Sequence, residues 1–154
     1  MTTKLEFSMQ AVFQLNNIEK ACFDRDAWSI QALIGEFRNS FSHFFAYEID
    51  DKIVGYSCVR IMFEEAQICN VAVLPEYRRK GIATELMTWM EEFAMEKGCE
   101  RCELEVNVEN LPAVELYRKC GYKEEGIRKN FYRKSRYPSR DAYTMLLQLV
   151  EKAE

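Results

Sequence analysis

The chain has 154 residues, 48% of them hydrophobic and 30% charged, which is typical of one compact globular domain. It has no apolar run near the roughly 20 residues needed to span a bilayer, and its start lacks the apolar core of a signal peptide. The net charge of -4 argues against a general nucleic-acid binder, so we expect a single cytoplasmic domain, residues 1–154, without a membrane segment.

The first half of the chain predicts two helices followed by three strands. In order, these are a helix that ends near Cys22, a helix over 28–37, and strands over 43–49, 52–63 and 66–74. Ser29 is suited to cap the second helix. Asp50 and Asp51 predict a hairpin turn between the first two strands, and Pro75 ends the third strand.

The second half predicts helices and strands in alternation. In order, these are a long helix from Gly81 to about Lys97, a strand over 101–108, a short helix over 111–120 and a strand over 141–150. Gly98 and Gly121 suit the ends of the two helices, and Pro112 suits the first turn of the second. The whole order predicts an α/β (α+β) domain with a mixed sheet, in which the strands before and after the long helix run parallel.

Six cysteines, at positions 22, 58, 69, 99, 102 and 120, are expected to stay reduced in a cytosolic protein. Cys99 and Cys102 form a C-x-x-C, a spacing that metal and redox sites use. A zinc site would need two further ligands, and the only histidine is His43. A redox pair would begin a helix, whereas this pair precedes a predicted strand. We therefore expect small buried hydrophobic residues at all six positions, and no metal site.

The stretch "YRRKGIA" at the start of the long helix is suited to bind an anion. The first N–H groups of a helix have no partner within it and lie at the positive end of its dipole. Arg78, Arg79 and Lys80 add positive charge, and Gly81 lets a ligand approach the backbone. These residues predict a cradle for a phosphate or pyrophosphate. On their own they also fit a solvated basic helix start with a packing glycine.

The loop and three longer stretches resemble a known family. Arg78-x-x-Gly81-x-Ala83 is similar to the Q/R-x-x-G-x-G/A signature of the GNAT N-acetyltransferase superfamily. The stretches "ICNVAVLPEYRRKGIATELM", "LEVNVENLPAVELYRKCGY" and "IRKNFY...DAYTM" occur in that family's order. They look like the branch that acetylates protein N-termini, typified by ribosomal-protein-alanine N-acetyltransferases.

This resemblance implies a fold, a cosubstrate and the residues that bind it. The fold is a mixed, mostly antiparallel sheet of roughly six to seven strands with about four helices. The cosubstrate is acetyl-coenzyme A (acetyl-CoA), with no metal. The residues implied to bind it are Val71, Ala72, Val73, Arg78, Arg79, Lys80, Gly81, Ile82, Ala83, Thr84 and Asn110.

Glu105 and Tyr117 are the catalytic residues that the resemblance implies. Alternation along "CELEV" puts Glu105 on the face opposite Leu104, where it could belong to a solvated sheet face or point into a cleft. The resemblance matches Glu105 with the family's general base, and an α-amine with a pKa near ~8 needs only a modest base. It matches Tyr117 with the general acid that protonates the departing thiolate. From its position alone, Tyr117 would equally be an aromatic core residue.

Three aromatic residues are implied on the acceptor side. Phe23 and Trp28 lie between the first two predicted helices, where the family shapes its peptide groove, and Tyr132 lies near the end of the chain. Packing on the core is the alternative for the first two. Ala27 stands where the branch often has proline, and Arg140 stands where it commonly has an acid, which would put a cation beside the groove. These departures leave the exact acceptor open.

Residues 123–140 form a basic stretch, with seven Lys or Arg against two Glu and with Phe131, Tyr132 and Tyr137 between them. Such a stretch could bind RNA, an acidic protein or a ribosomal surface. It could also be a solvated hairpin whose cations protect an edge strand, which is the interpretation we favour.

The predicted function is acetyl transfer from acetyl-CoA to the N-terminal α-amine of a protein, by direct attack in a ternary complex. The expected partner is an alanine-starting ribosomal protein, with no nucleic acid and no membrane involved. Two alternatives stay open: a GNAT enzyme that acetylates a small amine or a lysine side chain, and a non-enzymatic module that binds ribosomes or RNA.

Overall fold

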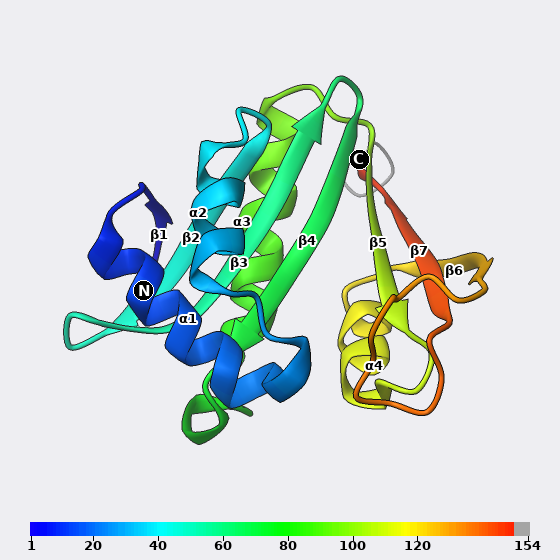
Figure 1. Ribbon diagram of the computed structural model, residues 1–154. Coiled ribbons are helices and arrows are strands. Elements are labelled where there is room, and N and C mark those ends of the chain that lie inside the picture. Colours follow the sequence, from blue (N-terminus) through cyan, green and yellow to red (C-terminus); the bar gives the residue numbers. More distant parts are fainter. Residues whose placement is uncertain (150–154) are drawn as a thin grey trace.

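A seven-stranded sheet forms the centre of the computed structural model, which describes residues 1–149 (Figure 1). The strands are β1 (Thr2–Leu5), β2 (Ser42–Ile49), β3 (Lys52–Met62), β4 (Glu65–Val73), β5 (Arg101–Asn107), β6 (Lys123–Arg128) and β7 (Ala142–Gln148). They lie in the order β1-β2-β3-β4-β5-β7-β6. The β4–β5 pair is parallel and the other five pairs of neighbours are antiparallel, which confirms the predicted mixed sheet.

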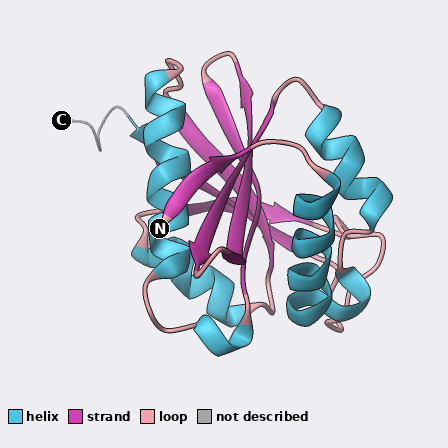
Figure 2. Cartoon of the chain, turned by 90° about the vertical axis from the view of Figure 1, so that its left-hand side faces the viewer, coloured by secondary structure: helices cyan, strands magenta, loops and turns pink. Residues whose placement is uncertain are grey.

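Helices cover both faces of the sheet (Figure 2). They are α1 (Met9–Phe23), α2 (Ile30–Arg38), α3 (Ile82–Glu96) and α4 (Leu111–Lys119), with short 3-10 turns η1 (Asp24–Asp26) and η2 (Pro75–Tyr77). The α1 and α2 helices lie on one face, and α3 and α4 lie on the other. Within residues 1–149, no helix has both the length and the apolar character needed to cross a membrane.

Most of these elements begin or end at the capping and turn residues from which the sequence predicted their ends. Ser29 caps α2, since its side chain accepts a hydrogen bond from a backbone N–H of the first turn at 3.1 Å. Asp50 and Asp51 both have positive φ and form the turn between β2 and β3. Gly98, at φ 85°, follows α3, and Gly121, at φ 96°, follows α4. These positions need left-handed backbone, which glycine adopts at low cost.

The sequence prediction misses some boundaries. It does not include β1, because four residues are too few to show a clear alternation. It begins the second helix at Trp28, whereas α2 starts at Ile30 and Trp28 lies before the cap. β6 is the edge strand that the hairpin interpretation of 123–140 expects. The predicted strand over 141–150 is β7, and its last predicted residue lies outside the described range.

Replacing Ser57 with alanine is expected to raise the free energy of unfolding by up to about 1 kcal/mol. Ser57 on β3 is 0% exposed, and its hydroxyl is the one buried side-chain group among the described residues without a hydrogen-bond partner. Removing the hydroxyl therefore removes the desolvation cost of a buried polar group that no hydrogen bond compensates. Urea denaturation of Ser57→Ala would measure the change.

Ser42→Ala is the matched control for this stability prediction. Ser42 lies on the neighbouring strand β2, and its hydroxyl donates to the Glu36 carboxylate. Its removal is expected to lower stability, because a hydrogen bond is lost. Equal destabilisation by Ser57→Ala and Ser42→Ala would contradict the prediction.

Candidate active site

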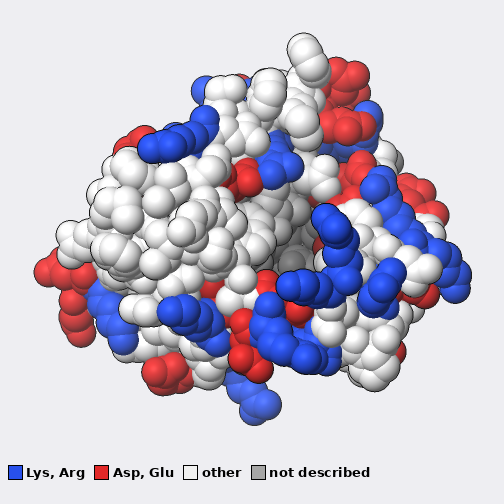
Figure 3. All heavy atoms as spheres, viewed as in Figure 1, with Lys and Arg blue, Asp and Glu red and all other residues white. Residues whose placement is uncertain are grey.

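A cleft of about 870 Å³ opens where β4 and β5 separate. It is lined by the end of α1 and the η1 segment, by the middle of β4, by β5, by α4 and by the loop between β6 and β7. Figure 3 shows a hollow on this side of the molecule, in the view of Figure 1. The cleft therefore brings together segments from the beginning, middle and end of the chain.

The cleft exists because two parallel strands pair over only part of their length. β4 and β5 pair from Glu65 and Arg101 to Gln67 and Glu103, and no further. Just beyond this point the register of β3 and β4 shifts, and Cys69 is the extra residue of a bulge. A bulge bends its strand, so the end of β4 turns away from β5 and leaves a backbone edge facing the cleft.

Glu105 presents its carboxylate to this cleft from β5. Its side chain is only 9% exposed, while its neighbours Leu104 and Val106 are buried on the opposite face, so the predicted alternation is confirmed. The Gln67 amide donates to the carboxylate at 2.6 Å across the split, and Arg128 lies 3.7 Å away. Burial raises the pKa of Glu105, an effect that Arg128 and Gln67 partly offset.

Tyr117 lines the same cleft from α4 and is 9% exposed. Its hydroxyl forms no hydrogen bond with any described residue, and burial raises its pKa to about 12. Tyr132, on the β6–β7 loop, also lines the cleft. Burial, together with the nearby Tyr117 and Glu105, raises the pKa of Tyr132 above its usual range. Two protonated phenols and the Glu105 carboxylate thus share the cleft.

The predicted anion loop forms a smaller cavity of about 190 Å³ at the start of α3. Gly81, at φ 79°, precedes Ile82, the first residue of the helix, and Arg79 also has positive φ. A Cβ atom at Gly81 would meet no atom within 4 Å, so the backbone is open to a ligand there. The free N–H groups of the first helical turn and two arginines therefore converge on one open space.

The two cavities contain most of the residues that the resemblance assigned to the cosubstrate. Val71 and Asn110 line the large cleft. The smaller cavity is lined by Val73, Arg78, Arg79, Gly81, Ile82, Ala83 and Thr84. Ala72 and Lys80 line neither: Ala72 is buried within the sheet, and Lys80 lies over the ring of Tyr77. Asn110 also caps α4, because its side chain accepts the Ala113 N–H at 3.4 Å.

All three predicted acceptor residues, Phe23, Trp28 and Tyr132, line the large cleft. The segment that carries Trp28 is held at both backbone groups. Its N–H donates to Glu19 at 2.8 Å and its carbonyl accepts from Asn16 at 3.0 Å. Arg140, which the sequence analysis placed beside the groove, is exposed and does not line the cleft.

Glu19 lines the cleft and was not predicted. It is 0% exposed, and its carboxylate also accepts hydrogen bonds from Tyr56 at 2.8 Å and Asn70 at 2.7 Å. Burial raises its pKa, although these donors oppose the shift. One signal in the sequence could have found it: Glu19 lies at helical spacing with Leu15 and Ile18, on the apolar face of the first predicted helix. An acid on such a face needs buried partners.

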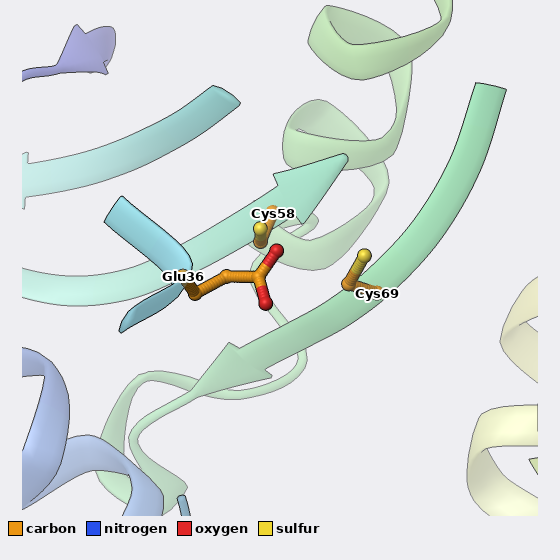
Figure 4. A group of neighbouring side chains, drawn as sticks. All are labelled: Glu36, Cys58 and Cys69. Atoms are coloured by element: carbon orange, nitrogen blue, oxygen red, sulfur yellow. The ribbon is translucent and has the colours of Figure 1, made fainter. Parts of the chain in front are cut away.

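A second cluster, formed by Glu36, Cys58 and Cys69, lies beside the cleft between α2, β3 and β4 (Figure 4). Their ligand atoms all lie within 4.8 Å of one another, and Cys69 lines the cleft. The three residues lie far apart in the sequence, so their spacing gives no signal of a metal site. Arg60 already forms two hydrogen bonds with the Glu36 carboxylate, at 2.7 and 2.8 Å, so a metal ion would compete with this guanidinium.

The six cysteines agree with the sequence prediction in part. All six are free. Cys22, Cys58, Cys99 and Cys102 are buried, as expected for small hydrophobic residues, whereas Cys69 and Cys120 are only partly buried. Cys69 differs because the bulge in β4 brings it to the cleft, a position that depends on strand pairing and not on local sequence.

Comparison with known proteins gives one consistent result. Residues 9–122 match the acetyltransferase (GNAT) family. A protein from Bacillus subtilis, provisionally named a ribosomal protein bS18-alanine N-acetyltransferase, is 34% identical over 80% of this chain and 82% of its own. An N-alpha-acetyltransferase from Sulfurisphaera tokodaii is 34% identical over 69% of each chain.

Solved structures share the fold. The crystal structure of the ribosomal-protein-S18-alanine N-acetyltransferase from Escherichia coli has a TM-score of 0.84 at 24% identity, over 97% of this chain and 94% of its own. A Thermoplasma acidophilum N-acetyltransferase in complex with coenzyme A has a TM-score of 0.76 at 18% identity, over 96% of this chain and 99% of its own.

Proposed function

Because this chain belongs to the acetyltransferase (GNAT) family, we propose that it transfers the acetyl group of acetyl-CoA to the N-terminal α-amino group of a protein. The observation that carries the proposal is the shared cleft of Glu105 and Tyr117, a carboxylate and a protonated phenol, at the split between β4 and β5. The names of the Bacillus subtilis and Sulfurisphaera tokodaii relatives support an N-terminal amine as acceptor. The acceptor that we propose is a ribosomal protein that begins with alanine, modified in the cytoplasm.

The residues present fit acetyl-CoA. Its pyrophosphate would lie against the open backbone at Gly81, with the first N–H groups of α3 and the side chains of Arg78 and Arg79 as partners. Its pantetheine amides would pair with the free edge of β4 near Val71, as an added strand does. Asn110 would contribute from the start of α4. Bound acetyl-CoA would supply a thioester whose carbonyl carbon is the electrophile.

Glu105 would remove a proton from the incoming ammonium, directly or through one water molecule. Burial raises its pKa, which makes it a stronger base than an exposed carboxylate. Once neutral, the amine would attack the thioester carbonyl in a ternary complex, so that the N–C bond forms, the C–S bond breaks and the nitrogen loses its second proton to solvent. Tyr117 would donate its hydroxyl proton toward the leaving sulfur, since its pKa of about 12 keeps it protonated at neutral pH.

A mass-spectrometric assay with acetyl-CoA and short peptides that differ in their first residue tests the proposed function. We expect acetylation on Nα, mapped by fragmentation, with alanine-starting peptides among the best acceptors. Acetylation only on lysine side chains, or only on small amines, would contradict the proposed acceptor while leaving the family assignment in place. If acetyl-CoA binds but no acetyl group is transferred to any acceptor, the proposal that the protein is an acetyltransferase is contradicted.

A further inference from the structure

In the large cleft, acidic residues lie deep and basic residues lie near the mouth. Glu19 is fully buried and the Glu105 side chain is 9% exposed, so two carboxylates lie at the inner end. Four cations lie at the more exposed mouth, and we call them the basic rim: Arg25, Arg133, Lys134 and Arg136. Figure 3 shows Lys and Arg side chains gathered along the margin of the hollow on this face. The cleft is thus acidic inside and basic outside.

The basic rim is held together before any ligand arrives. Arg25 lies in η1 and the other three lie on the β6–β7 loop. The Arg136 guanidinium donates to the Cys22 carbonyl at 2.7 Å, and its backbone N–H donates to Asp26 at 3.1 Å. The Asn107 amide of β5 donates to two groups of the same loop, at 2.9 and 3.0 Å. The loop that carries three of the rim residues is therefore held in place, so that binding does not have to order its backbone, which favours affinity.

The charges of the basic rim are not neutralised within the protein. None of the four side chains has a carboxylate within 4.0 Å among residues 1–149. Asp26, the third acid that lines the cleft, is engaged by a backbone N–H and not by a rim side chain. In contrast, Arg128 and Lys129, which lie a few residues before Arg133 in the chain, pair with Glu105 and Asp141. Four cations without a carboxylate partner thus lie at one opening, in a chain of net charge -4, and this arrangement favours binding of an anionic ligand.

Resting on the proposed function, we propose that this enzyme selects protein N-termini in which acidic side chains directly follow the residue that is acetylated. An ammonium group is drawn to the carboxylates at the inner end. An extended peptide rises by about 3.3–3.6 Å per residue, so its second to fourth residues pass the mouth as the chain leaves the cleft. Aspartate or glutamate at these positions would meet Arg133 and Lys134, whereas lysine or arginine would be repelled.

The phosphates of acetyl-CoA are the other anions that could use these cations. None of the four rim residues lines the cavity at the start of α3, where Arg78 and Arg79 converge with free backbone N–H groups. The basic rim and the basic loop at the start of α3 are therefore separate, and substitutions in the two regions should have different effects. The proposal requires that loss of rim charge changes the KM for the peptide and leaves the KM for acetyl-CoA unchanged.

Three peptides that differ only in residues two to four test the proposal: alanine followed by acidic, by neutral amide, or by basic residues. We expect kcat/KM for the acidic peptide to exceed that for the neutral peptide by about tenfold at low salt, which corresponds to two or three exposed ion pairs. The advantage is expected to shrink as salt rises, because exposed charges are screened. It should appear mainly in KM.

The double variant Arg133→Gln/Lys134→Gln is expected to remove most of this preference. Both side chains are exposed, so the fold should be retained. Arg133→Glu/Lys134→Glu should turn the preference toward the basic peptide, a gain that a folding defect cannot produce. Lys119→Gln/Lys123→Gln is the matched control, since it removes the same charge from exposed positions outside the cleft and should leave the preference unchanged.

The outcomes separate this inference from the proposed function. Equal Nα-acetylation of all three peptides, or a preference for the basic one, would overturn the inference and leave the proposed function standing. A raised KM for acetyl-CoA in the rim variants would overturn it as well. Absence of Nα-acetylation on every peptide would contradict the proposed function itself.

Discussion

Glu105→Gln is expected to lower kcat by about 10²–10⁴-fold, the range typical of removing a general base. Glutamine keeps the size of the side chain and can still contact Gln67, so the cleft should keep its shape. It cannot accept a proton from the ammonium. Steady-state kinetics with the best peptide of the panel would measure the loss, and isothermal titration would show an unchanged affinity for acetyl-CoA.

The pH profile gives the Glu105 assignment a second readout. In the wild-type enzyme, kcat/KM should rise with pH through the raised pKa of Glu105, since only the ionised carboxylate can accept the proton of the ammonium. Without this base, the profile of Glu105→Gln should instead rise through the α-amine pKa near ~8, since only acceptor that is already neutral can react. No fall is expected below about pH 10, because the pKa of Tyr117 is about 12.

Glu103→Gln is the control for this variant. Glu103 lies two residues earlier on the same face of β5 but does not line the cleft. Its charge raises the pKa of Glu105, so its removal should lower that pKa slightly and shift the acidic limb of the profile to lower pH. Unchanged turnover in Glu105→Gln, or an equal loss in both variants, would rule out Glu105 as the base.

Tyr117→Phe should lower kcat by about 10²-fold, the lower end of the range for a general acid. The leaving thiolate is already a fair leaving group, since a thiol has a pKa near ~8.5. The phenol, at a pKa of about 12, is the weaker acid in the ground state. Its donation becomes favourable only as negative charge develops on a sulfur inside the same buried cleft, where desolvation raises the thiol pKa too. The effect should therefore appear in kcat and little in KM.

Two further measurements distinguish a catalytic effect of Tyr117→Phe from a loss of stability. The Tyr117 hydroxyl has no hydrogen-bond partner among the described residues, so Tyr117→Phe should retain the melting temperature of the wild type. Tyr143→Phe removes a hydroxyl from half-buried Tyr143 on β7, outside the cleft, and should retain full activity. Unchanged thiol release in Tyr117→Phe, or an equal loss in Tyr143→Phe, would show that Tyr117 is not the acid.

The sequence by itself determined the features that depend on a few neighbouring residues. Ser29 and Asn110 cap helices because their side chains reach N–H groups of the next turn. Gly81 precedes α3 at a position with positive φ, and Asp50 and Asp51 turn the hairpin in the same way. The anion loop could be predicted for this reason, since both its charge and its free N–H groups arise within one short segment.

Pattern alone could not decide what Glu105 and Tyr117 face. Alternation placed Glu105 on the polar side of β5, but whether that side meets water or a cleft depends on how far β4 and β5 pair. The bulge at Cys69 settles this point, and it arises from pairing between β3 and β4. The resemblance to a family supplied the two roles, while burial in the cleft supplied the pKa shifts.

Only the tertiary structure brought the distant parts of the site together. Glu19 enters the cleft because Trp28, Tyr56 and Asn70, from three other segments, hold its buried carboxylate. In the basic rim, Arg136 contacts Cys22 and Asp26, in the segment that carries Arg25, across more than a hundred positions of the chain. Burial, desolvation and charge pairing are set by distances in space, and local propensity carries no information about residues so far apart in sequence.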